Sequence, residues 1–144
     1  MPEFNEKAMR QFNEGLIKEF RANGGKVLSG PFVNAPLMLL TTTGAKSGRP
    51  FTTPLVYTRD GGRIVIIASK GGFPTNPAWF HNLKANPTVT VEVGTQKFQA
   101  KASITSEPER QRLFDAQAKL MPNFNEYQKN TTRVIPVIVL QPIQ

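Results

Sequence analysis

Hydrophobic and polar positions follow two different periods along this chain, and each period predicts a different kind of element. Near the start, apolar residues recur at every fourth position with charged residues between them, which is typical of an amphipathic helix. We predict this helix within residues 1–25, because Asn23, Gly24 and Gly25 supply a stop signal after it. Its apolar positions are Phe4, Ala8, Phe12, Leu16 and Phe20.

Something must cover the apolar face of this amino-terminal helix. We expect it to pack against the rest of the same chain or against a second subunit in a homodimer. Its lysines and arginines leave one alternative open, a weak peripheral contact with a membrane surface through a basic amphipathic face.

After the helix the pattern becomes strand-like, in short segments rich in β-branched residues. The links 60–62 and 94–96 contain glycine and suit tight hairpins, so neighbouring strands should be largely antiparallel. Short strands in this number imply a sheet that curls or closes, in a single domain over residues 1–144. The six predicted strands are 37–43, 54–58, 63–68, 88–93, 97–105 and 134–140.

Two short helices should interrupt the strands. Asn76 before Pro77 is a typical N-cap with proline in the first turn, and it predicts a helix over 78–84. The sequence Ser-Glu-Pro-Glu at 106–109 has the form of a capping box, which predicts a second helix that ends before Pro122.

Composition limits the chemistry that this domain can perform. At 144 residues the chain is too small for separate cofactor and substrate domains, so one site does everything or two subunits share it. It has no cysteine and one histidine, His81, which excludes thiolate chemistry and argues against a metal site. No apolar run approaches the roughly 20 residues that cross a bilayer, and no signal peptide is evident, so we expect a cytoplasmic protein.

The formal net charge of +8 favours an anionic partner. Between Ala22 and Val91 the only acidic residue is Asp60, and this stretch also holds two glycine-containing loops. A local excess of cations beside exposed backbone amides suits a phosphate or polycarboxylate ligand. The seven bases of the stretch are Lys26, Lys46, Arg49, Arg59, Arg63, Lys70 and Lys84.

The first loop, 43–50, carries two cations, two hydroxyls and two glycines directly after a predicted strand. Glycine lets backbone N–H groups approach an anion, while Lys46 and Arg49 neutralise its charge. The loop is not a Walker A motif, because Ala45 stands where glycine would precede Lys46. A plain hairpin turn is the alternative interpretation.

The second loop, 68–72, follows the most hydrophobic predicted strand. Seven residues beyond its end, Trp79 begins a short aromatic stretch, where an indole could stack on a flat heterocycle and Asn82 could bind its edge. A core position at the end of the barrel is an equally good interpretation of Trp79. For His81 we favour an exposed or structural role.

With both loops in place, the chain resembles the deazaflavin-dependent nitroreductase family, F420-dependent oxidoreductases typical of actinobacteria. The matching stretches keep the family's order and leave only the amino-terminal helix weakly matched. They are residues 39–48, 59–63, 68–72, 76–79, 82–87 and 133–136.

This resemblance implies a mainly β (α+β) fold, a six-stranded antiparallel split β-barrel with short flanking helices, related to flavin reductases and pyridoxamine-phosphate oxidases. It implies that coenzyme F420, in its reduced form F420H2, gives a hydride to an electron-poor organic substrate. Ser69 and Tyr127 are the catalytic candidates, and the final proton comes from Tyr127 or, preferably, from water.

The resemblance also assigns two sets of binding residues. Substrate would lie against Val56, Trp79, Met121, Phe124 and Tyr127. The cofactor would be held by Lys46, Ser47, Gly48, Arg49, Pro54, Ala68, Ser69, Lys70, Gly71, Gly72, Trp79 and Asn82.

Departures from the family pattern narrow the expected substrate. Nitroimidazole-activating members carry tyrosines where this chain has Val56, Met121 and Phe124, so we expect weak nitroimidazole activation. Activated double bonds in coumarin-like lactones and quinones remain the favoured targets, beside other nitroaromatics.

Three alternatives stay open at this point: an FMN-binding split-barrel oxidoreductase, a non-catalytic F420-binding protein, and a nucleic-acid-binding protein. We expect no nucleic acid partner, because the chain lacks the repeated exposed aromatics and the reading helix of such proteins.

Overall fold

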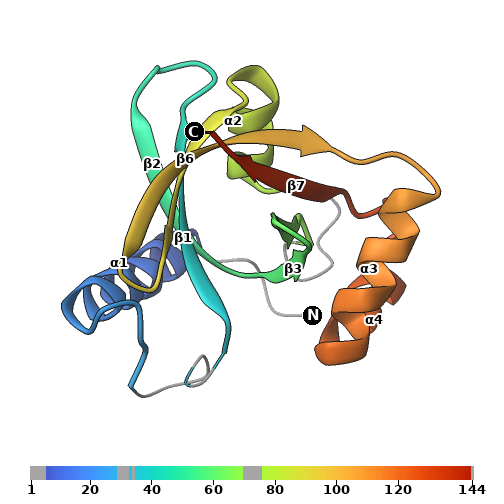
Figure 1. Ribbon diagram of the computed structural model, residues 1–144, viewed down its shortest axis with the longest axis horizontal. Coiled ribbons are helices and arrows are strands. Elements are labelled where there is room, and N and C mark those ends of the chain that lie inside the picture. The colour runs from blue at the N-terminus through green and yellow to red at the C-terminus, as the bar shows by residue number, and fades with distance from the viewer. Residues whose placement is uncertain (1–5, 29–32, 34, 70–75, 144) are drawn as a thin grey trace.

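The computed structural model describes residues 6–28, 33, 35–69 and 76–143, and within them seven antiparallel strands form one curled sheet (Figure 1). The strand order is β2-β1-β5-β6-β7-β4-β3, so β2 and β3 are the two edges. This confirms the predicted α+β split barrel. The strands are β1 Leu37–Thr43, β2 Pro50–Val56, β3 Thr58–Asp60, β4 Arg63–Ile67, β5 Thr88–Val93, β6 Gln96–Ile104 and β7 Val137–Pro142.

The prediction of six strands was wrong, because the segment predicted at 54–58 contributes to two strands. β2 begins at Pro50 and pairs with β1 over its whole length, while β3 pairs with β4. Tyr57 separates them: its backbone N–H donates to the carbonyl oxygen of Pro36 at 3.0 Å. The chain therefore crosses from one edge of the sheet to the other within one residue.

Both predicted hairpins are present. The β3–β4 turn has Gly61 at φ +63°, and the β5–β6 turn has Gly94 at φ +58°. L-residues with side chains rarely adopt these left-handed angles, which explains the choice of glycine.

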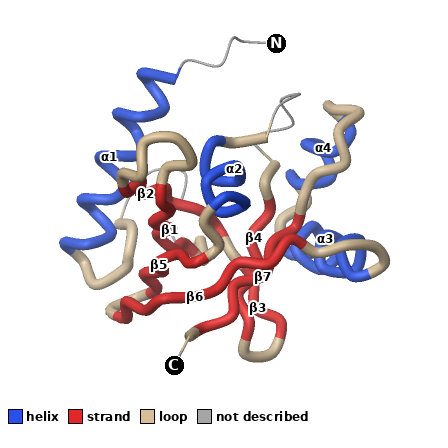
Figure 2. The backbone as a smooth tube through the Cα atoms, turned by 90° about the horizontal axis from the view of Figure 1, so that it is seen from above, coloured by secondary structure: helices blue, strands red, loops and turns tan. Residues whose placement is uncertain are grey.

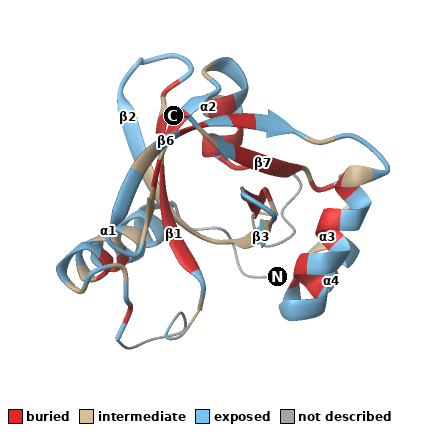
Figure 3. Cartoon of the chain, in the orientation of Figure 1, coloured by how far each residue is buried: buried red, intermediate tan, exposed pale blue. Residues whose placement is uncertain are grey.

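The barrel core lies on the inner face of the sheet, which we define by the buried side chains of Met38, Leu40, Ile64, Ile66 and Leu140 and their neighbours. Helix α2, Ala78–Ala85, closes one end of this core with its buried residues Trp79, Phe80 and Leu83. Figure 3 shows much of β1 and β7 in the colour of buried residues.

On the outer face of β4 and β7, alternate residues contact two further helices, α3 Glu109–Leu120 and α4 Asn123–Lys129. Alternation along a strand sends consecutive side chains to opposite faces, so Val65 and Ile67 reach this side. α3 was predicted, including its end before Pro122, whereas α4 was not.

Helix α1, Glu6–Ala22, packs on the sheet through its second half. Leu16 and Phe20 are buried against Leu37 and Leu39 of β1. Arg21 adds a two-pronged ion pair to the carboxylate of Glu92 on β5, at 3.1 and 2.8 Å. The predicted packing of this helix on its own chain is confirmed, while Phe4 lies outside the described residues.

Both predicted helix caps differ from the structure. Pro77 is the residue before α2, and the side-chain oxygen of Asn76 accepts a hydrogen bond from Arg133 instead of capping the helix. Ser106 makes no capping bond to α3; the carboxylate of Glu107 accepts from the backbone N–H of Gln111 at 3.2 Å. At α2, a residue distant in sequence binds the side chain that was predicted to cap the helix. At α3, the helix begins later than the predicted motif requires.

The last predicted strand, 134–140, begins three residues later than expected, at Val137. The buried guanidinium of Arg110 on α3 donates to the carbonyl oxygen of Ile135 at 3.0 Å, and the Ile135 N–H donates to the side chain of Gln128 on α4 at 3.2 Å. Ile135 therefore bonds to the two helices rather than to the sheet. Among the helices described, none is long and apolar enough to span a membrane.

Candidate functional site

The loop between β1 and β2 is an exposed cationic turn, which we call the anion loop and define as residues 44–49. The backbone N–H of Gly44 donates to the carbonyl of Arg49 at 2.7 Å, and that of Gly48 donates to the carbonyl of Gly44 at 3.0 Å. A β-carbon at Gly44 would come within 2.5 Å of the Ser47 hydroxyl oxygen and 2.8 Å of the Phe51 ring. A larger residue at Gly44 would therefore require the Ser47 and Phe51 side chains to move.

Two backbone donors of the anion loop are free to bind a ligand. In the described part of the chain, the N–H groups of Lys46 and Ser47 have no protein acceptor. Successive free amides of this kind form an anion-binding concavity, and the exposed cations of Lys46 and Arg49 flank it. Ser47 accepts from the backbone N–H of Arg49 at 3.2 Å, which leaves its own hydroxyl hydrogen available.

Asn82 fixes the anion loop to α2. Its side-chain oxygen accepts from the backbone N–H of Ala45 at 3.1 Å, and its amide nitrogen donates to the Thr42 hydroxyl at 3.2 Å. One turn further on, Asn86 donates to the carbonyl of Thr43 at 3.4 Å. Both polar atoms of the Asn82 amide thus serve the protein, and its predicted contact with a cofactor stays a prediction.

A groove of about 410 Å³ opens beside the neck of the anion loop. Half of its lining residues are threonines, and Thr43 and Pro50 join it directly to the loop. No sequence motif indicated this groove, because its lining comes from four separate segments. The lining residues include Thr41, Asn86, Thr88, Thr90 and Gln99.

The end of β4 leads into the second predicted loop. Ala68 is fully buried in the barrel core, and its N–H donates to the carbonyl of Pro136 at 3.0 Å. Ser69 is half-buried beside it. The predicted cofactor residues Lys70, Gly71 and Gly72 lie outside the described residues.

Helix α2 connects the two predicted binding regions. Figure 2 shows it between the ends of β1 and β2 on one side and of β4 on the other. Asn82 on the helix bonds to the anion loop, and Asn76 just before it bonds to Arg133, which also bonds to Ala68 and Ser69. Eight residues at about 1.5 Å each make α2 a spacer of roughly 12 Å.

The structure brings together four of the five predicted substrate residues. Val56, Met121, Phe124 and Tyr127 belong to the hydrophobic cluster on the outer face of β4. Phe124 is buried and meets the half-buried Tyr127 edge to face, with ring centroids 5.4 Å apart. The Tyr127 hydroxyl accepts from Asn123 at 2.8 Å.

Trp79 stands apart from that group. It is 6 % exposed and belongs to the barrel core on the inner face, so β4 and β7 separate it from Phe124 and Tyr127. The core interpretation of Trp79 describes its surroundings, and its binding role stays a prediction. Pro54 is half-buried in the edge strand β2, opposite Leu39.

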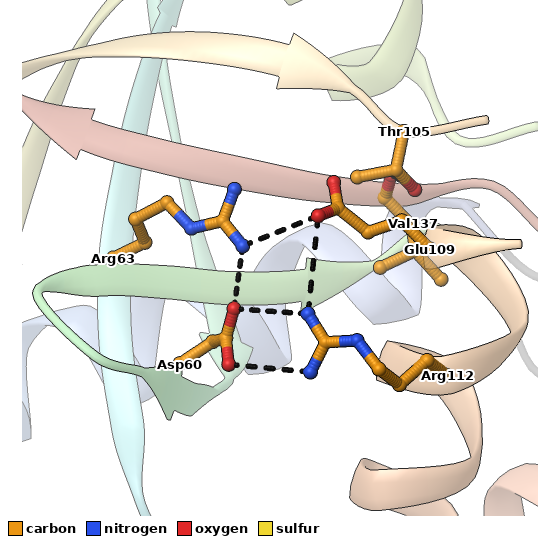
Figure 4. A network of polar contacts seen from close by, with 6 residues as sticks. All are labelled: Asp60, Arg63, Thr105, Glu109, Arg112 and Val137. Carbon is orange, nitrogen blue, oxygen red and sulfur yellow. Dashed lines mark hydrogen bonds and ion pairs between the residues drawn. The ribbon is translucent and has the colours of Figure 1, made fainter.

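The seven basic residues between Ala22 and Val91 do not all lie at the anion loop. Arg63, one of the seven bases, bonds to Asp60 and Glu109, and Arg112 bonds to the same two carboxylates (Figure 4). Hydrogen bonds from Arg112 and Arg63 lower the pKa of Asp60 below its ordinary value. This network joins the β3–β4 hairpin to α3, so Arg63 does not belong to the anion-binding set.

Two polar residues of these regions were missed by sequence reasoning. Arg133 was noted only as part of a family stretch, although its guanidinium holds both Ala68 and Ser69. Gln117 of α3 is fully buried: its oxygen accepts from Thr58 at 3.3 Å, and its amide nitrogen has no hydrogen-bond partner among the described residues. A glutamine on the apolar stripe of α3 was the available signal for the second.

The residues present fit an anionic, planar cofactor. Free amides and cations in the anion loop suit phosphate and carboxylate groups, and α2 holds this loop at a set distance from the end of β4. An apolar cluster with a partly exposed tyrosine lies on the outer side of the same strand. Fold and candidate site together are typical of a split-barrel oxidoreductase.

Comparisons with known proteins agree with this class. The F420H(2)-dependent quinone reductase family matches residues 14–142. The F420H(2)-dependent quinone reductase Rv1261c of Mycobacterium tuberculosis is 47% identical over 108 residues, which cover 73% of this chain and 72% of that protein.

Solved structures give the same result. An F420-H2 dependent reductase, FDR-A, superposes with a TM-score of 0.68 at 39% identity, covering 74% of this chain and 94% of that one. A structure described as a domain-swapped dimer has a TM-score of 0.70 at 34% identity, with 94% and 98% covered. A FAD-binding protein from Mesorhizobium loti, 14% identical with a TM-score of 0.53 over 76% and 82%, shows the fold alone.

The chain belongs to the F420H(2)-dependent quinone reductase family. Its predicted family, its enzymatic nature and reduced F420 as its hydride donor are thereby confirmed.

Proposed function

We propose that this protein reduces quinones with hydride from F420H2, and that its anion loop anchors the cofactor. The observation that carries the proposal is the tight turn at 44–49, with two free backbone N–H groups between two exposed cations. Family membership and the name of the similar mycobacterial enzyme support quinones as the acceptor. When bound, the cofactor supplies the hydride, so the protein needs few acid–base groups.

In this proposal, different parts of the chain bind different parts of the cofactor. Lys46, Ser47, Gly48 and Arg49 hold the phosphate and the acidic tail, with the threonine-rich groove beside them as the path for the tail. Ala68 and Ser69 lie by the ring, at the end of a strand that fixes their backbone. This arrangement favours transfer by holding the reacting atoms in one geometry.

Substrate binds on the outer face of β4 in this proposal. Val56, Met121, Phe124 and Tyr127 offer an apolar surface that is partly open, which suits a flat, uncharged quinone. The proton that completes the reduction comes from Tyr127 or from water. A large loss of kcat in Tyr127→Phe identifies the hydroxyl, and an unchanged kcat identifies water.

A direct assay tests the activity. Purified protein is mixed with F420H2 and a panel of quinones, coumarin-like lactones and nitroaromatics, and reoxidation of the cofactor is followed. We expect turnover with quinones at a rate well above that with nitroimidazoles. Binding of F420 without turnover on any acceptor would indicate a carrier, and tighter binding of FMN than of F420 would contradict the cofactor assignment.

Lys46→Ala tests the anion loop itself. Loss of one charge-assisted contact should weaken F420 binding by about 10- to 100-fold, as measured by calorimetry. Lys119→Ala on α3 is the matched control, since it removes an exposed lysine charge away from both the loop and the groove. Equal affinities for Lys46→Ala and the wild type would remove the anchoring role.

The first half of α1 supports a further proposal, that two copies of this chain associate. Met9 and Phe12 are each 44% exposed, and a similar protein is described as a domain-swapped dimer. Phe12→Glu should lower the mass measured by light scattering from dimer to monomer. A monomeric wild type that sediments with anionic vesicles would favour the peripheral membrane contact instead.

A further inference from the structure

Among the described residues, Arg133 binds three groups, which come from positions before and after residues 70–75 in the sequence. Its guanidinium donates to the carbonyl oxygen of Ala68 at 3.0 Å and to that of Ser69 at 2.8 Å. It also donates to the side-chain oxygen of Asn76, just before α2. One side chain therefore fixes the last residues of β4 and the approach to α2 together.

The guanidinium is suited to this role by its shape and its surroundings. A planar fork can donate several hydrogen bonds in fixed directions, which a lysine ammonium cannot reproduce. Partial burial lowers the pKa of Arg133 through desolvation, and hydrogen bonds are stronger where water is partly excluded.

The backbone around Arg133 is tied to α4 as firmly as its side chain is tied to β4. The Gln128 side chain donates to the carbonyl of Arg133 at 2.8 Å and accepts from the N–H of Ile135 at 3.2 Å. Gln128 follows Tyr127 directly in the same helix, which also carries Phe124. The segment after α4 thus joins the aromatic residues to the end of β4.

We propose that Arg133 is a positioning residue that sets the end of β4 relative to α4, and so sets hydride donor against acceptor. This inference rests on the proposed function, in which Ser69 lies by the cofactor ring and Phe124 and Tyr127 contact the substrate. Hydride transfer is sensitive to small displacements, because a shift of about 1 Å can cost on the order of 100-fold in rate.

The competing explanation is that Arg133 only stabilises the fold, and Arg110 offers a matched control for it. Arg110 is more deeply buried than Arg133, and it donates to the carbonyl of Ile135, to Glu107 and to Gln111. It therefore also makes several hydrogen bonds, and one of them anchors the segment that contains Arg133. Among the described residues its hydrogen-bond partners do not include the end of β4, so its loss should leave that strand end in place.

The experiment compares Arg133→Met with Arg110→Met at temperatures where both are folded. We expect kcat for quinone reduction to fall about 10- to 100-fold in Arg133→Met and less than about threefold in Arg110→Met. F420 affinity should change little in either, because the anion loop is intact. Amide hydrogen exchange of residues 64–69 should accelerate in Arg133→Met alone.

A second pair covers the case in which Arg133→Met does not fold. Asn76→Leu removes one of the acceptors of Arg133, whereas Asn76→Asp retains an oxygen for it. We expect Asn76→Leu to lose several-fold in kcat and Asn76→Asp to keep nearly the wild-type value.

Three results would overturn the inference: equal kcat losses in the two arginine variants, equal exchange of residues 64–69, or equal losses in both Asn76 variants. A wild type that binds no F420 would refute the proposed function instead. In that case the exchange of residues 64–69 still decides whether Arg133 holds the strand end.

Discussion

The two faces of β4 are both covered by helix, yet they differ in chemistry. On the inner face, Ile64, Ile66 and Ala68 lie in an apolar core that α2 closes with Trp79. On the outer face, Val65 and Ile67 meet α3 and α4, whose side contains a buried glutamine and a partly exposed tyrosine. One strand thus separates a closed core from a surface that retains polar groups and access to solvent.

The difference shows how a small domain accommodates both stability and binding. The inner core supplies the apolar burial that holds the barrel, since densely packed interiors tolerate little change. The outer face also contains a group whose burial costs stability: the amide nitrogen of Gln117 is buried and has no hydrogen-bond partner among the described residues. Substrate contact is therefore expected where packing is least complete.

The largest expected effect lies on the inner face. Trp79→Ala should lower the free energy of unfolding by about 3–5 kcal/mol, because it leaves a large cavity in the barrel core. Urea unfolding measures this, with Trp79→Phe as the control that retains most of the volume. A loss below about 1 kcal/mol together with a raised KM for quinone would place Trp79 at the binding surface instead.

An intermediate effect is expected for the polar pair on the outer face. Thr58→Val leaves both ends of the Gln117 amide without a partner and should cost about 1–3 kcal/mol. The double variant Thr58→Val/Gln117→Met replaces the pair with apolar groups and should lie within about 1 kcal/mol of the wild type. If the double variant is as unstable as the single, the unpartnered amide is not the cause.

The smallest effect concerns the ion pairs that attach α3 to the β3–β4 hairpin. Hydrogen bonds from Arg112 and Arg63 lower the pKa of Asp60 from its ordinary value of 3.8. The stabilisation is therefore present at neutral pH and is lost as the pH falls below about 4 through the folded-state pKa.

Thermal unfolding measured at several pH values tests whether the ion pairs of Asp60 stabilise the fold. Asp60→Asn should melt below the wild type at pH 7, and the two melting temperatures should converge as the pH falls below about 4. Lys129→Ala, which removes an exposed ion pair with Glu126 on α4, is the control. A difference that grows on acidification would contradict the assignment.

Much of the fold could be predicted because local chemistry specifies it. The β-branched segments, the glycine turns at Gly61 and Gly94 and the stop after Ala22 all appear in the structure. The sheet extends to seven strands because the pairing of β2 with β1 decides where β2 begins. Helix α4 was missed because its short polar sequence has little periodicity, and its one buried residue, Phe124, packs against distant strands.

The candidate site was predicted unevenly for the same reason. The anion loop is continuous in sequence, so its cations and glycines could be found together. Asn82 was selected, but its bonds to Ala45 and Thr42 depend on how α2 meets the sheet. Asn76 was assigned a local capping role, and a distant arginine took its side chain instead.

By itself, the sequence determined a basic domain of short antiparallel strands with a cationic turn and a set of stretches that match one enzyme family. Only the tertiary structure decided that Trp79 and Tyr127 lie on opposite sides of β4, and that Arg133 joins the end of that strand to the segment after α4. Turns and helix stops depend on neighbouring residues, which the chain order fixes. The face on which a side chain lies, and the long-range hydrogen bonds it makes, depend on strand pairing and helix packing between residues far apart in the sequence. Arg133 and Ala68, for example, are 65 positions apart.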